Sequence, residues 1–544
     1  MTIPPDAAQK GVFSPVYNWP LIAIHAALLP DGRVMTYGSN GDGQQTGFFI
    51  YDVWDSTQQP NAGHLTLPNT TQTDLFCSSQ VLVPLNGNGA VPQLVISNGD
   101  NWVGNSTTNT GNNRSSIFDP ATNTLARGPD LNRARWYGSS TVLLNGEVYI
   151  QGGWDGTDRP EIRGADGTYR LLAIDTSGLD FYYPRNFVAP DGRVFGFDTF
   201  GHQYYVDPVN GSLSVVGQTG DAVIGPDSTA AMFRPGRILQ LGGFANKSVV
   251  IDINGPTPVQ SGLTTMSSQR RLATATVLPD GQVLVTGGSP VWNDLANAAL
   301  TAETWNPQTG QWSAMATAAL PRLYHSTALL LADATVLVAG GGAPGPLTNL
   351  NAEVYYPPYL FTADGLEAPR PVILGTPDYL QVGKTIAIDT APGSTIGRVT
   401  LVKTGSVTHG WNMDQRFLEL PFRTEGDRVY AQAPTHAGEV PPGYYLLFVF
   451  DANGVPSKGK ILNLGVAANP NPDVTPTLAS PGDQNSTNGT PLDLALNASD
   501  PNGDVLRYSA AGLPPGLAIN ATTGHITGTP TTNGSFDVVL SVTD

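Results

Sequence analysis

Two of the seven histidines stand beside side chains that could share a metal ion with them. His325 directly follows Tyr324, and His409 lies in a short polar segment that continues to Arg416. Neutral imidazole nitrogen and phenolate oxygen are ligands that suit Cu(II) in a tetragonal site. These residue types indicate a copper centre as one hypothesis, with a structural role for both histidines as the alternative.

The remaining histidines and the single cysteine have plainer interpretations. The other histidines lack a metal-binding neighbour pattern, and we expect structural roles for His25, His64, His202, His436 and His525. Cys77 is the only cysteine, which excludes an intramolecular disulfide between cysteine side chains. Taken alone, it is expected to be a small buried hydrophobic residue.

The position of Tyr324 and His325 depends on the element that carries them. Adjacent residues of a strand point to opposite faces, so both can reach one metal only where a strand ends or bends. An apolar run begins at Ser326, which places the pair at the start of a predicted strand. The ends of the inner strands line the axis of a β-propeller, where such a pair could meet a metal.

A repeated hairpin pattern predicts that propeller. An apolar strand, an Asp-Gly turn or a substitute for it, a second apolar strand and then glycine recur at irregular intervals. One hairpin cannot bury its apolar face alone, so the copies must stack, and four-stranded repeats close radially. The copies cover residues 25–38, 77–99, 139–153, 186–197, 228–243, 273–288 and 326–342. We therefore predict a seven-bladed, kelch-type β-propeller over residues 1–366, with an open β-sandwich array as the alternative.

The pattern changes after the propeller. Residues 367–467 contain short strands separated by turns, which predict an immunoglobulin-like sandwich. A Pro- and Asn-rich linker begins at Ala468, and the segment to Asp544 resembles the Ig-like modules of secreted bacterial proteins. The predicted fold class is thus all-β, with a propeller followed by two sandwich domains. In the last module, Asp500 and Asp504 could supply oxygen ligands to Ca²⁺, although a simple turn is the favoured explanation.

Composition excludes several classes of function. The net charge of −17 and the absence of a basic patch argue against a nucleic-acid partner. No stretch approaches the roughly 18 apolar residues of a membrane helix. Residues 1–5 do not have the character of a secretory signal. The low charged fraction of 13% and the final module nevertheless favour a secreted protein whose leader is not in this sequence.

Four motifs in order identify a known family. Tyr324-His325-Ser326, followed by an apolar run and three glycines, resembles the copper-ligand segment of the copper-radical oxidases, the family of galactose oxidase and glyoxal oxidase. Residues 408–416 are similar to its second-histidine motif, T-H-x-x-N-x-D-Q-R. Residues 74–78 match its D-x-F-C segment, and residues 133–140 match its R-x-Y strand entry. The resemblance spans roughly residues 15–466.

The resemblance implies a site and a reaction. Tyr137, His325 and His409 would bind one copper ion in a plane, and Tyr324 would be the axial ligand and general base. Cys77 would be joined to Tyr137 by a thioether that allows the ring to hold a radical. The implied reaction oxidises a small aldehyde or primary alcohol with O₂ and forms H₂O₂. Trp154 would shield the crosslinked ring, and a tryptophan on a blade rim is its alternative.

The sequence is compatible with more than one substrate and more than one class of function. Arg185 is displaced by one position from the sugar-binding arginine of the family pattern, but it could still contact the substrate, and Trp292 could line the substrate mouth. The displacement favours a small aldehyde or alcohol over galactose, whereas Trp154 favours the galactose pattern. A galactose or other carbohydrate alcohol oxidase is the first alternative. A non-catalytic kelch scaffold attached to a cell surface or polysaccharide is the alternative of another class. A propeller hydrolase lacks the expected arginine cluster.

Overall fold

A computed structural model gives the fold, and it describes residues 2–84, 92–220, 225, 227–465, 476–499 and 506–543. Across these residues strands dominate, and α1 (Ala7–Lys10) is accompanied only by two short 3₁₀ turns, η1 (Trp154–Gly156) and η2 (Pro358–Leu360). The all-β prediction is confirmed. Asp500 and Asp504, the predicted calcium ligands, lie outside the described residues, as does the boundary predicted at residue 467.

Among the described residues, seven antiparallel sheets follow one another between residues 12 and 356. The innermost strands are β3 (His25–Leu28), β7 (Ser79–Val83), β13 (Gly138–Val142), β17 (Arg185–Val188), β21 (Ser228–Arg234), β25 (Thr274–Val277) and β29 (Ser326–Leu330). Their hairpin partners are β4 (Val34–Tyr37), β8 (Gln93–Ser97), β14 (Val148–Gly152), β18 (Val194–Phe197), β22 (Arg237–Gly242), β26 (Val283–Thr286) and β30 (Val336–Gly340). These hairpins coincide with the repeats seen in the sequence.

Two further strands complete most sheets on the outside. The third strands are β5 (Ile50–Trp54), β11 (Ser115–Asp119), β15 (Glu161–Arg163), β19 (His202–Asp207), β23 (Lys247–Asp252), β27 (Thr301–Trp305) and β31 (Asn351–Tyr356). The outer strands are β6 (His64–Pro68), β12 (Thr124–Arg127), β16 (Tyr169–Leu171), β20 (Ser212–Gln218), β24 (Val259–Thr265) and β28 (Trp312–Thr317). A small hairpin of β9 (Trp102–Val103) and β10 (Ser106–Thr107) stands beside them.

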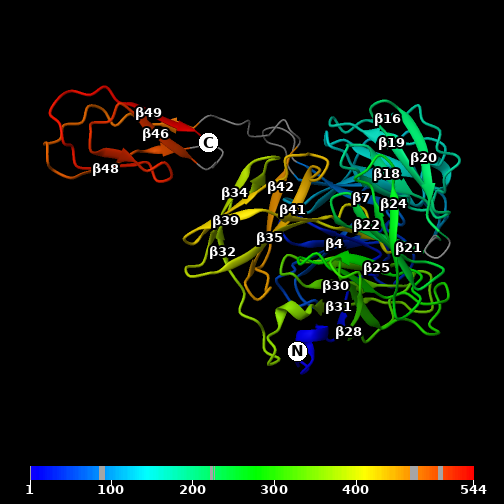
Figure 1. Ribbon diagram of the computed structural model, residues 1–544. Coiled ribbons are helices and arrows are strands. Elements are labelled where there is room, and N and C mark those ends of the chain that lie inside the picture. Colours follow the sequence, from blue (N-terminus) through cyan, green and yellow to red (C-terminus); the bar gives the residue numbers. More distant parts are fainter. Residues whose placement is uncertain are drawn as a thin grey trace.

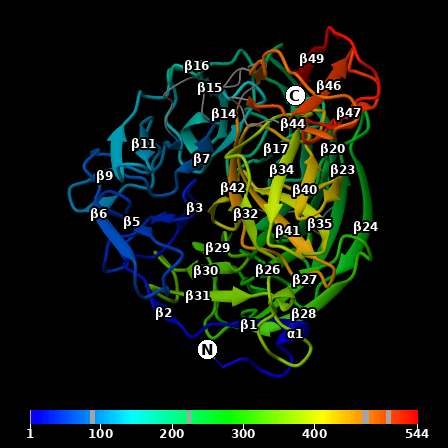
Figure 2. The same cartoon turned by 90° about the vertical axis from the view of Figure 1, so that its left-hand side faces the viewer.

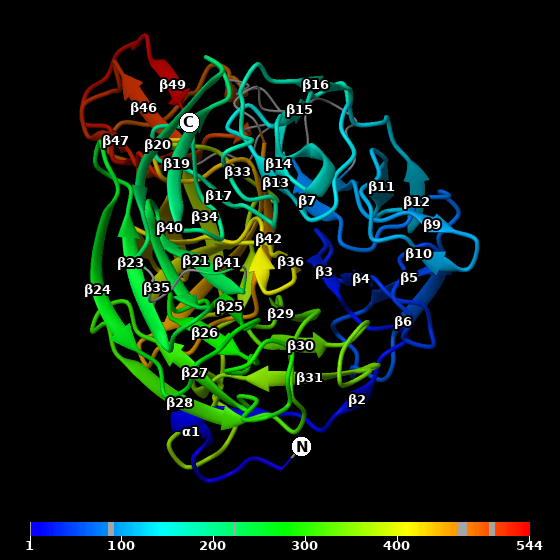
Figure 3. The same cartoon turned by 90° about the vertical axis from the view of Figure 1, so that its right-hand side faces the viewer.

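The sheets form a ring. Each innermost strand from β7 to β29 contacts the next, and β29 contacts β3, so the first and last sheets are neighbours (Figure 3). The amino-terminal strands β1 (Val12–Phe13) and β2 (Tyr17–Asn18) pair with β31, with Val12 opposite Tyr356. The chain's start therefore completes the last sheet and ties the ring closed.

Buried ion pairs hold the turns that lead into three of the innermost strands. In each case an arginine just before the strand donates to a glutamate on the third strand of the same sheet. Because both members are buried, removing one would leave an uncompensated charge, which typically costs about 3–5 kcal/mol. The pairs are Arg135–Glu161, Arg270–Glu303 and Arg322–Glu353.

The second domain is a sandwich that lies over one face of the ring (Figure 2). One sheet contains β32 (Ile373–Gly375), β34 (Thr385–Thr390), β40 (Arg428–Gln432) and β39 (Phe422–Glu425). The other contains β33 (Tyr379–Leu380), β42 (Lys460–Leu464), β41 (Gly443–Asp451), β35 (Ile396–Lys403) and β38 (Phe417–Leu420). Apolar residues from both sheets form a core of their own.

A hairpin of the second domain enters the ring. It consists of β36 (Ser406–Thr408) and β37 (Trp411–Asn412), and we call residues 406–412 the finger. β36 pairs antiparallel with β3, placing Thr408 opposite His25. β36 also contacts β7 and β29, and β37 contacts β21 and β25. The finger thus carries His409 to the axis of the ring.

The third segment has small sheets with little buried apolar surface. Its strands are β43 (Thr477–Leu478), β44 (Leu492–Ala495), β45 (Ala498–Ser499), β46 (Arg507–Ala511), β47 (Leu517–Ile519), β48 (His525–Gly528) and β49 (Val539–Thr543). All hydrogen bonds and ion pairs that its described residues make stay within the segment. Figure 1 shows it beyond the second domain, on the side away from the ring. We call residues 476–543 the terminal module.

Candidate metal centre

Most innermost strands are preceded by a residue in the left-handed backbone region. Five residues in the turns that lead into these strands have positive φ: Cys77 (56°), Tyr137 (71°), Tyr183 (39°), Leu272 (63°) and His325 (67°). A non-glycine residue in this region costs about 1–2 kcal/mol, so its repetition at the same place in successive sheets requires support from the surrounding fold. The turn also provides the bend that lets Tyr324 and His325 share one site.

The finger brings the second histidine to these turns. His409 has a φ of 50°, and the following Gly410 has a φ of 75°. A Cβ on Gly410 would lie 2.5 Å from the carbonyl oxygen of Ala273, so only glycine fits there. Gln415 fixes the finger's base, because its side chain accepts from the Val277 amide at 2.8 Å and donates to the Val277 carbonyl at 3.3 Å.

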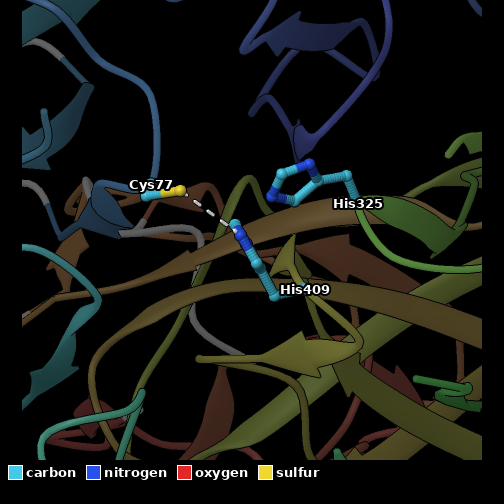
Figure 4. Close-up of side chains that lie close together, drawn as sticks. All are labelled: Cys77, His325 and His409. Atoms are coloured by element: carbon cyan, nitrogen blue, oxygen red, sulfur yellow. Dashed lines mark hydrogen bonds between the residues drawn. The ribbon is translucent and has the colours of Figure 1, made fainter. Parts of the chain in front are cut away.

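Three potential ligand atoms meet at the axis. The donor atoms of Cys77, His325 and His409 all lie within 4.8 Å of one another, and all three residues are buried (Figure 4). Cys77 Sγ lies 3.4 Å from Nε2 of His409. The two imidazole rings stand nearly perpendicular, with centroids 4.4 Å apart. No carboxylate belongs to this cluster in the described part of the chain.

Hydrogen bonds fix which imidazole nitrogen is available. Nδ1 of His325 lies 2.7 Å from the carbonyl oxygen of Gly342, which can only accept, so Nδ1 carries the proton. Nε2 of His325 is buried without a hydrogen-bond partner among the described residues. Nδ1 of His409 lies 2.6 Å from the Thr408 hydroxyl. Nε2 of His325 is therefore a buried acceptor without a donor, which fits a metal cation, and Nε2 of His409 faces Cys77.

Two tyrosines complete the cluster. The phenol oxygens of Tyr137 and Tyr324 are 2.6 Å apart. The Tyr324 ring stacks on His325 with centroids 3.7 Å apart, and the Tyr137 ring meets His409 edge-on at 5.3 Å. Tyr137 also donates its main-chain amide to the carbonyl of Cys77 at 3.2 Å. Two phenols, two imidazoles and one thiol therefore lie together in one buried cluster.

Burial sets the protonation of the group. It lowers the pKa of His325 to about 3 and that of His409 well below its usual range, so both imidazoles are neutral near neutral pH. It raises the pKa of Cys77, Tyr137 and Tyr324 well above their usual ranges. A bound cation would reverse that preference, because it stabilises thiolate and phenolate directly. The donor set of nitrogen, oxygen and sulfur suits copper better than a hard cation such as Mg²⁺.

The structure places Trp154 away from the cluster. Its side chain is 60% exposed and its ring meets Phe181 edge-on at 4.9 Å. The indole that lies against Tyr137 is Trp136, with ring centroids 4.3 Å apart. No ring contact joins Trp154 to Tyr137 within the described residues, so the geometry favours Trp136 over Trp154 as the shielding ring.

Arg185 and Trp292 have different surroundings. Arg185 is 2% exposed and donates to the main-chain carbonyls of Tyr182, Tyr183 and Ser228, which gives it a positioning role instead of the substrate contact expected from the sequence. Trp292 is 45% exposed, and its ring lies 5.4 Å from that of Tyr324. Trp292 therefore does lie beside the cluster at a position open to solvent.

Sequence reasoning missed several neighbours. The rings of Tyr182 and Tyr183 lie 5.0 and 5.3 Å from Tyr137, and Tyr183 lies 4.8 Å from His409. His25 is fully buried, stacks on Tyr37 at 4.4 Å and meets His409 edge-on at 5.9 Å. The repeat itself carries the signal for Tyr183, because this residue stands before an innermost strand as Tyr137 does.

Known proteins resemble the chain along most of its length. A model described as "Galactose oxidase-like, Early set domain" matches residues 370–464, and "Glyoxal oxidase N-terminus" matches residues 250–359. An Ig domain model matches residues 475–544. Galactose oxidase of Gibberella zeae is 28% identical over 506 residues, which cover 83% of this chain and 70% of the relative.

A plant relative and a solved structure extend the comparison. Aldehyde oxidase GLOX of Vitis pseudoreticulata is 28% identical over 386 residues, covering 62% of this chain and 73% of the relative. A fungal alcohol oxidase of the AA5 family, solved in complex with copper, has a TM-score of 0.74 at 22% identity and covers 84% of this chain and 100% of its own. That likeness gives the fold. The two oxidase-family models and these relatives support a place for the chain among the copper-radical oxidases, the family of galactose oxidase and glyoxal oxidase.

Proposed function

We propose that the protein is a copper-radical oxidase that oxidises a primary alcohol or a hydrated aldehyde with dioxygen and forms hydrogen peroxide. One observation carries the proposal. Cys77, Tyr137, Tyr324, His325 and His409 come from distant parts of the chain and meet at one buried point. A kelch scaffold that only binds partners would have no need to hold these five side chains together.

Each residue of the site would have a separate role in the reaction. Tyr137, Tyr324, His325 and His409 would hold copper, which when bound accepts one electron and positions the substrate oxygen. Nε2 of each histidine would bind the ion, because Gly342 and Thr408 engage Nδ1 of the two rings. Tyr324 accepts the proton of the substrate hydroxyl, and Tyr137, as an oxidised ring, takes the hydrogen atom from the carbon.

The overall reaction balances without an organic cofactor. An alcohol loses two electrons and two protons and becomes an aldehyde, and a hydrated aldehyde becomes an acid by the same loss. Dioxygen takes up the two electrons and two protons and becomes hydrogen peroxide. The exclusion of water around the buried rings protects the oxidised tyrosine between the two half-reactions.

A thioether between Cys77 and Tyr137 would make the ring easier to oxidise. Its formation removes the thiol hydrogen and one ring hydrogen, and dioxygen accepts both together with two electrons. The two side chains belong to one buried cluster, and the Tyr137 amide donates to the Cys77 carbonyl. The alternative is a free thiolate that binds the metal together with the two histidines.

Three candidate functions differ in the substrate that the protein would use. Burial of Arg185 removes the expected sugar-binding contact, which favours a small aldehyde or simple alcohol over galactose. A carbohydrate alcohol remains the second candidate, since Trp292 and Trp154 are exposed aromatic rings of the kind on which sugars stack. The third candidate function is a scaffold without catalysis.

Secretion, a calcium ion in the terminal module and attachment to a surface remain predictions from the sequence. Within the described residues, no helix is long and apolar enough to span a membrane.

Mass spectrometry tests the proposal directly. After copper loading in air, the intact protein should lose the mass of two hydrogen atoms, and digestion should yield a joined peptide that contains Cys77 and Tyr137. The Cys77→Ser variant is the matched control: it should bind copper, show no loss and form peroxide about 100-fold more slowly.

Two results would contradict parts of the proposal. A wild-type protein that binds copper but keeps an alkylatable Cys77 would favour the thiolate ligand. A protein that neither binds copper nor forms peroxide from any alcohol or aldehyde would favour the scaffold.

A further inference from the structure

One charged residue occupies a place that is aromatic in other sheets of the ring. Tyr324, Tyr182 and Trp136 each directly precede a left-handed residue that leads into an innermost strand. In the sheet that begins with β25, the left-handed residue is Leu272, and Arg271 takes the equivalent place. By this internal repetition, Arg271 stands at the level of Tyr324 around the axis.

A buried carboxylate holds the Arg271 side chain. Nε and Nη2 of Arg271 lie 2.7 and 2.6 Å from Oδ2 of Asp227. The Asp227 side chain is 2% exposed, whereas that of Arg271 is 21% exposed. The guanidinium carbon lies 5.1 Å from the centroid of the Phe244 ring. No described residue accepts a hydrogen bond from Nη1 of Arg271, so one edge of this fixed guanidinium is available to a ligand.

The loop that carries Trp292 connects this ion pair to the metal centre. The main chains of Arg271 and Ser289 pair through two hydrogen bonds of 2.9 and 3.1 Å, at the start of the loop. Trp292 then lies with its ring 5.4 Å from that of Tyr324. Burial raises the pKa of the Asp227 carboxyl, and hydrogen bonding by Arg271 and by the Trp292 side chain opposes that rise. Arg271, Asp227 and Trp292 therefore line one side of the approach to Tyr324.

We propose that Arg271, positioned by Asp227, binds the oxygen on the carbon next to the reacting carbon of the substrate. This inference rests on the proposed oxidase function. Asp227 neutralises the guanidinium charge, so the free edge favours a neutral hydroxyl or carbonyl oxygen over a carboxylate. The exposed rings of Trp292 (45%) and Phe244 (53%) complete an apolar wall around that contact. Arg271 is thus a specificity-determining residue from a different sheet than Arg185.

Paired substrates test this role. 1,2-Propanediol and 1-propanol share a carbon skeleton and differ by one adjacent oxygen, as methylglyoxal and propanal do. The Arg271→Lys variant keeps a cation beside Asp227 but loses the guanidinium edge. We expect it to raise the KM for the diol and for methylglyoxal about 10-fold or more, with kcat and both mono-oxygenated substrates changed less than about twofold.

A control variant at Arg237 and a second variant at Arg271 distinguish the possible results. Arg237→Lys changes a solvent-exposed ion pair with Asp252 on the neighbouring sheet, and it should leave all four substrates unaffected. Arg271→Ala should show the same discrimination more strongly, with some loss of stability because Asp227 is left unpaired. An active wild-type enzyme whose substrate preference is unchanged by both Arg271 variants would overturn this inference alone. A copper-loaded wild-type protein that forms no peroxide from any of the four would overturn the oxidase function, and this inference with it.

Discussion

At the scale of single residues, burial makes the candidate ligands neutral before any metal arrives. Burial lowers the pKa of His325 to about 3, although the hydrogen bond from Nδ1 to the Gly342 carbonyl opposes that shift. Tyr137 and Tyr324 keep their protons for the same reason of burial. Copper entering this group would displace the phenol protons but meet imidazoles that are already neutral. Metal uptake should therefore release protons from the phenol oxygens and not from imidazolium nitrogen.

His325 should make the metal-free protein less stable in acid. Its pKa in the unfolded chain is near 6.5, so below that value the unfolded state binds a proton that the folded state does not take until about pH 3. The contribution of His325 to the free energy of unfolding is present above pH 6.5 and is lost as the pH falls through this window. His325→Asn should reduce the loss between pH 6.5 and 4.5 by about 1–2 kcal/mol, measured by denaturant unfolding.

His64 gives a control of opposite sign. Asp52 raises its pKa, so its stabilising contribution is present at low pH and is lost as the pH rises. The variant His64→Asn should therefore lose more stability than the wild type on acidification. If the free energy of unfolding changes with pH equally in the wild type and in His325→Asn, then His325 is not held neutral in the folded state.

At this scale, the sequence predicts which residues form the candidate site better than it predicts which residues pack around them. The types and order of Cys77, Tyr137, Tyr324, His325 and His409 predict the group that the structure brings together. Trp154 and Trp136 show the limit, because both stand near an inner strand and only the turn geometry decides which indole faces Tyr137. Arg185 shows it again, since the three carbonyls that capture its guanidinium cannot be read from spacing.

At the scale of elements, the finger is the part that assembles the centre. The side chains of Gln415 and Arg416 bind the main chains of β25 and β17, so the finger is anchored to two sheets of the ring as well as paired with β3. The polar residues of the second-histidine motif thus serve docking, while His409 alone reaches the other ligands. The repeat of hairpins predicts the ring, but nothing in the sequence indicates that a strand from another domain pairs inside it.

Gly410→Ala should disrupt the centre through the finger. The new Cβ would meet the Ala273 carbonyl at 2.5 Å, and the backbone φ of 75° adds strain. We expect a loss of about 2–4 kcal/mol in the free energy of unfolding and a weaker affinity for copper. Gly426→Ala is the matched control, because Gly426 has a φ of 60° with no atom within 4 Å of an added Cβ. It should cost only about 1 kcal/mol, and equal losses for both variants would show that the close contact has no effect.

At the scale of the whole molecule, the ring and the second domain behave as one unit. The finger inserts into the ring, and β1 closes the ring by pairing with β31. The terminal module makes its described hydrogen bonds only within itself. The sequence predicts this division from the change of pattern and the Pro- and Asn-rich linker, whereas the docking of the second domain on the ring depends on contacts that no local pattern encodes.

A chain ending at residue 465 should keep the full oxidase function. Because no described contact of the terminal module supports the ring, its removal should leave the thermal midpoint of the main unfolding transition within about 2 °C and copper stoichiometry unchanged. Differential scanning calorimetry and metal analysis of the two chains would measure this. A clear fall in the main transition would show that the terminal module stabilises the catalytic part.

The pairing of β3 with β36 also determines when the protein can become active. During synthesis β3 emerges long before the finger, so the first strand of the ring must wait for a partner made near the end of the catalytic region. Until residue 409 has left the ribosome, the other four side chains of the site lack His409 and cannot form the complete pocket. A chain that ends before the finger therefore cannot catalyse the oxidation. Only molecules whose translation has passed the finger can form peroxide.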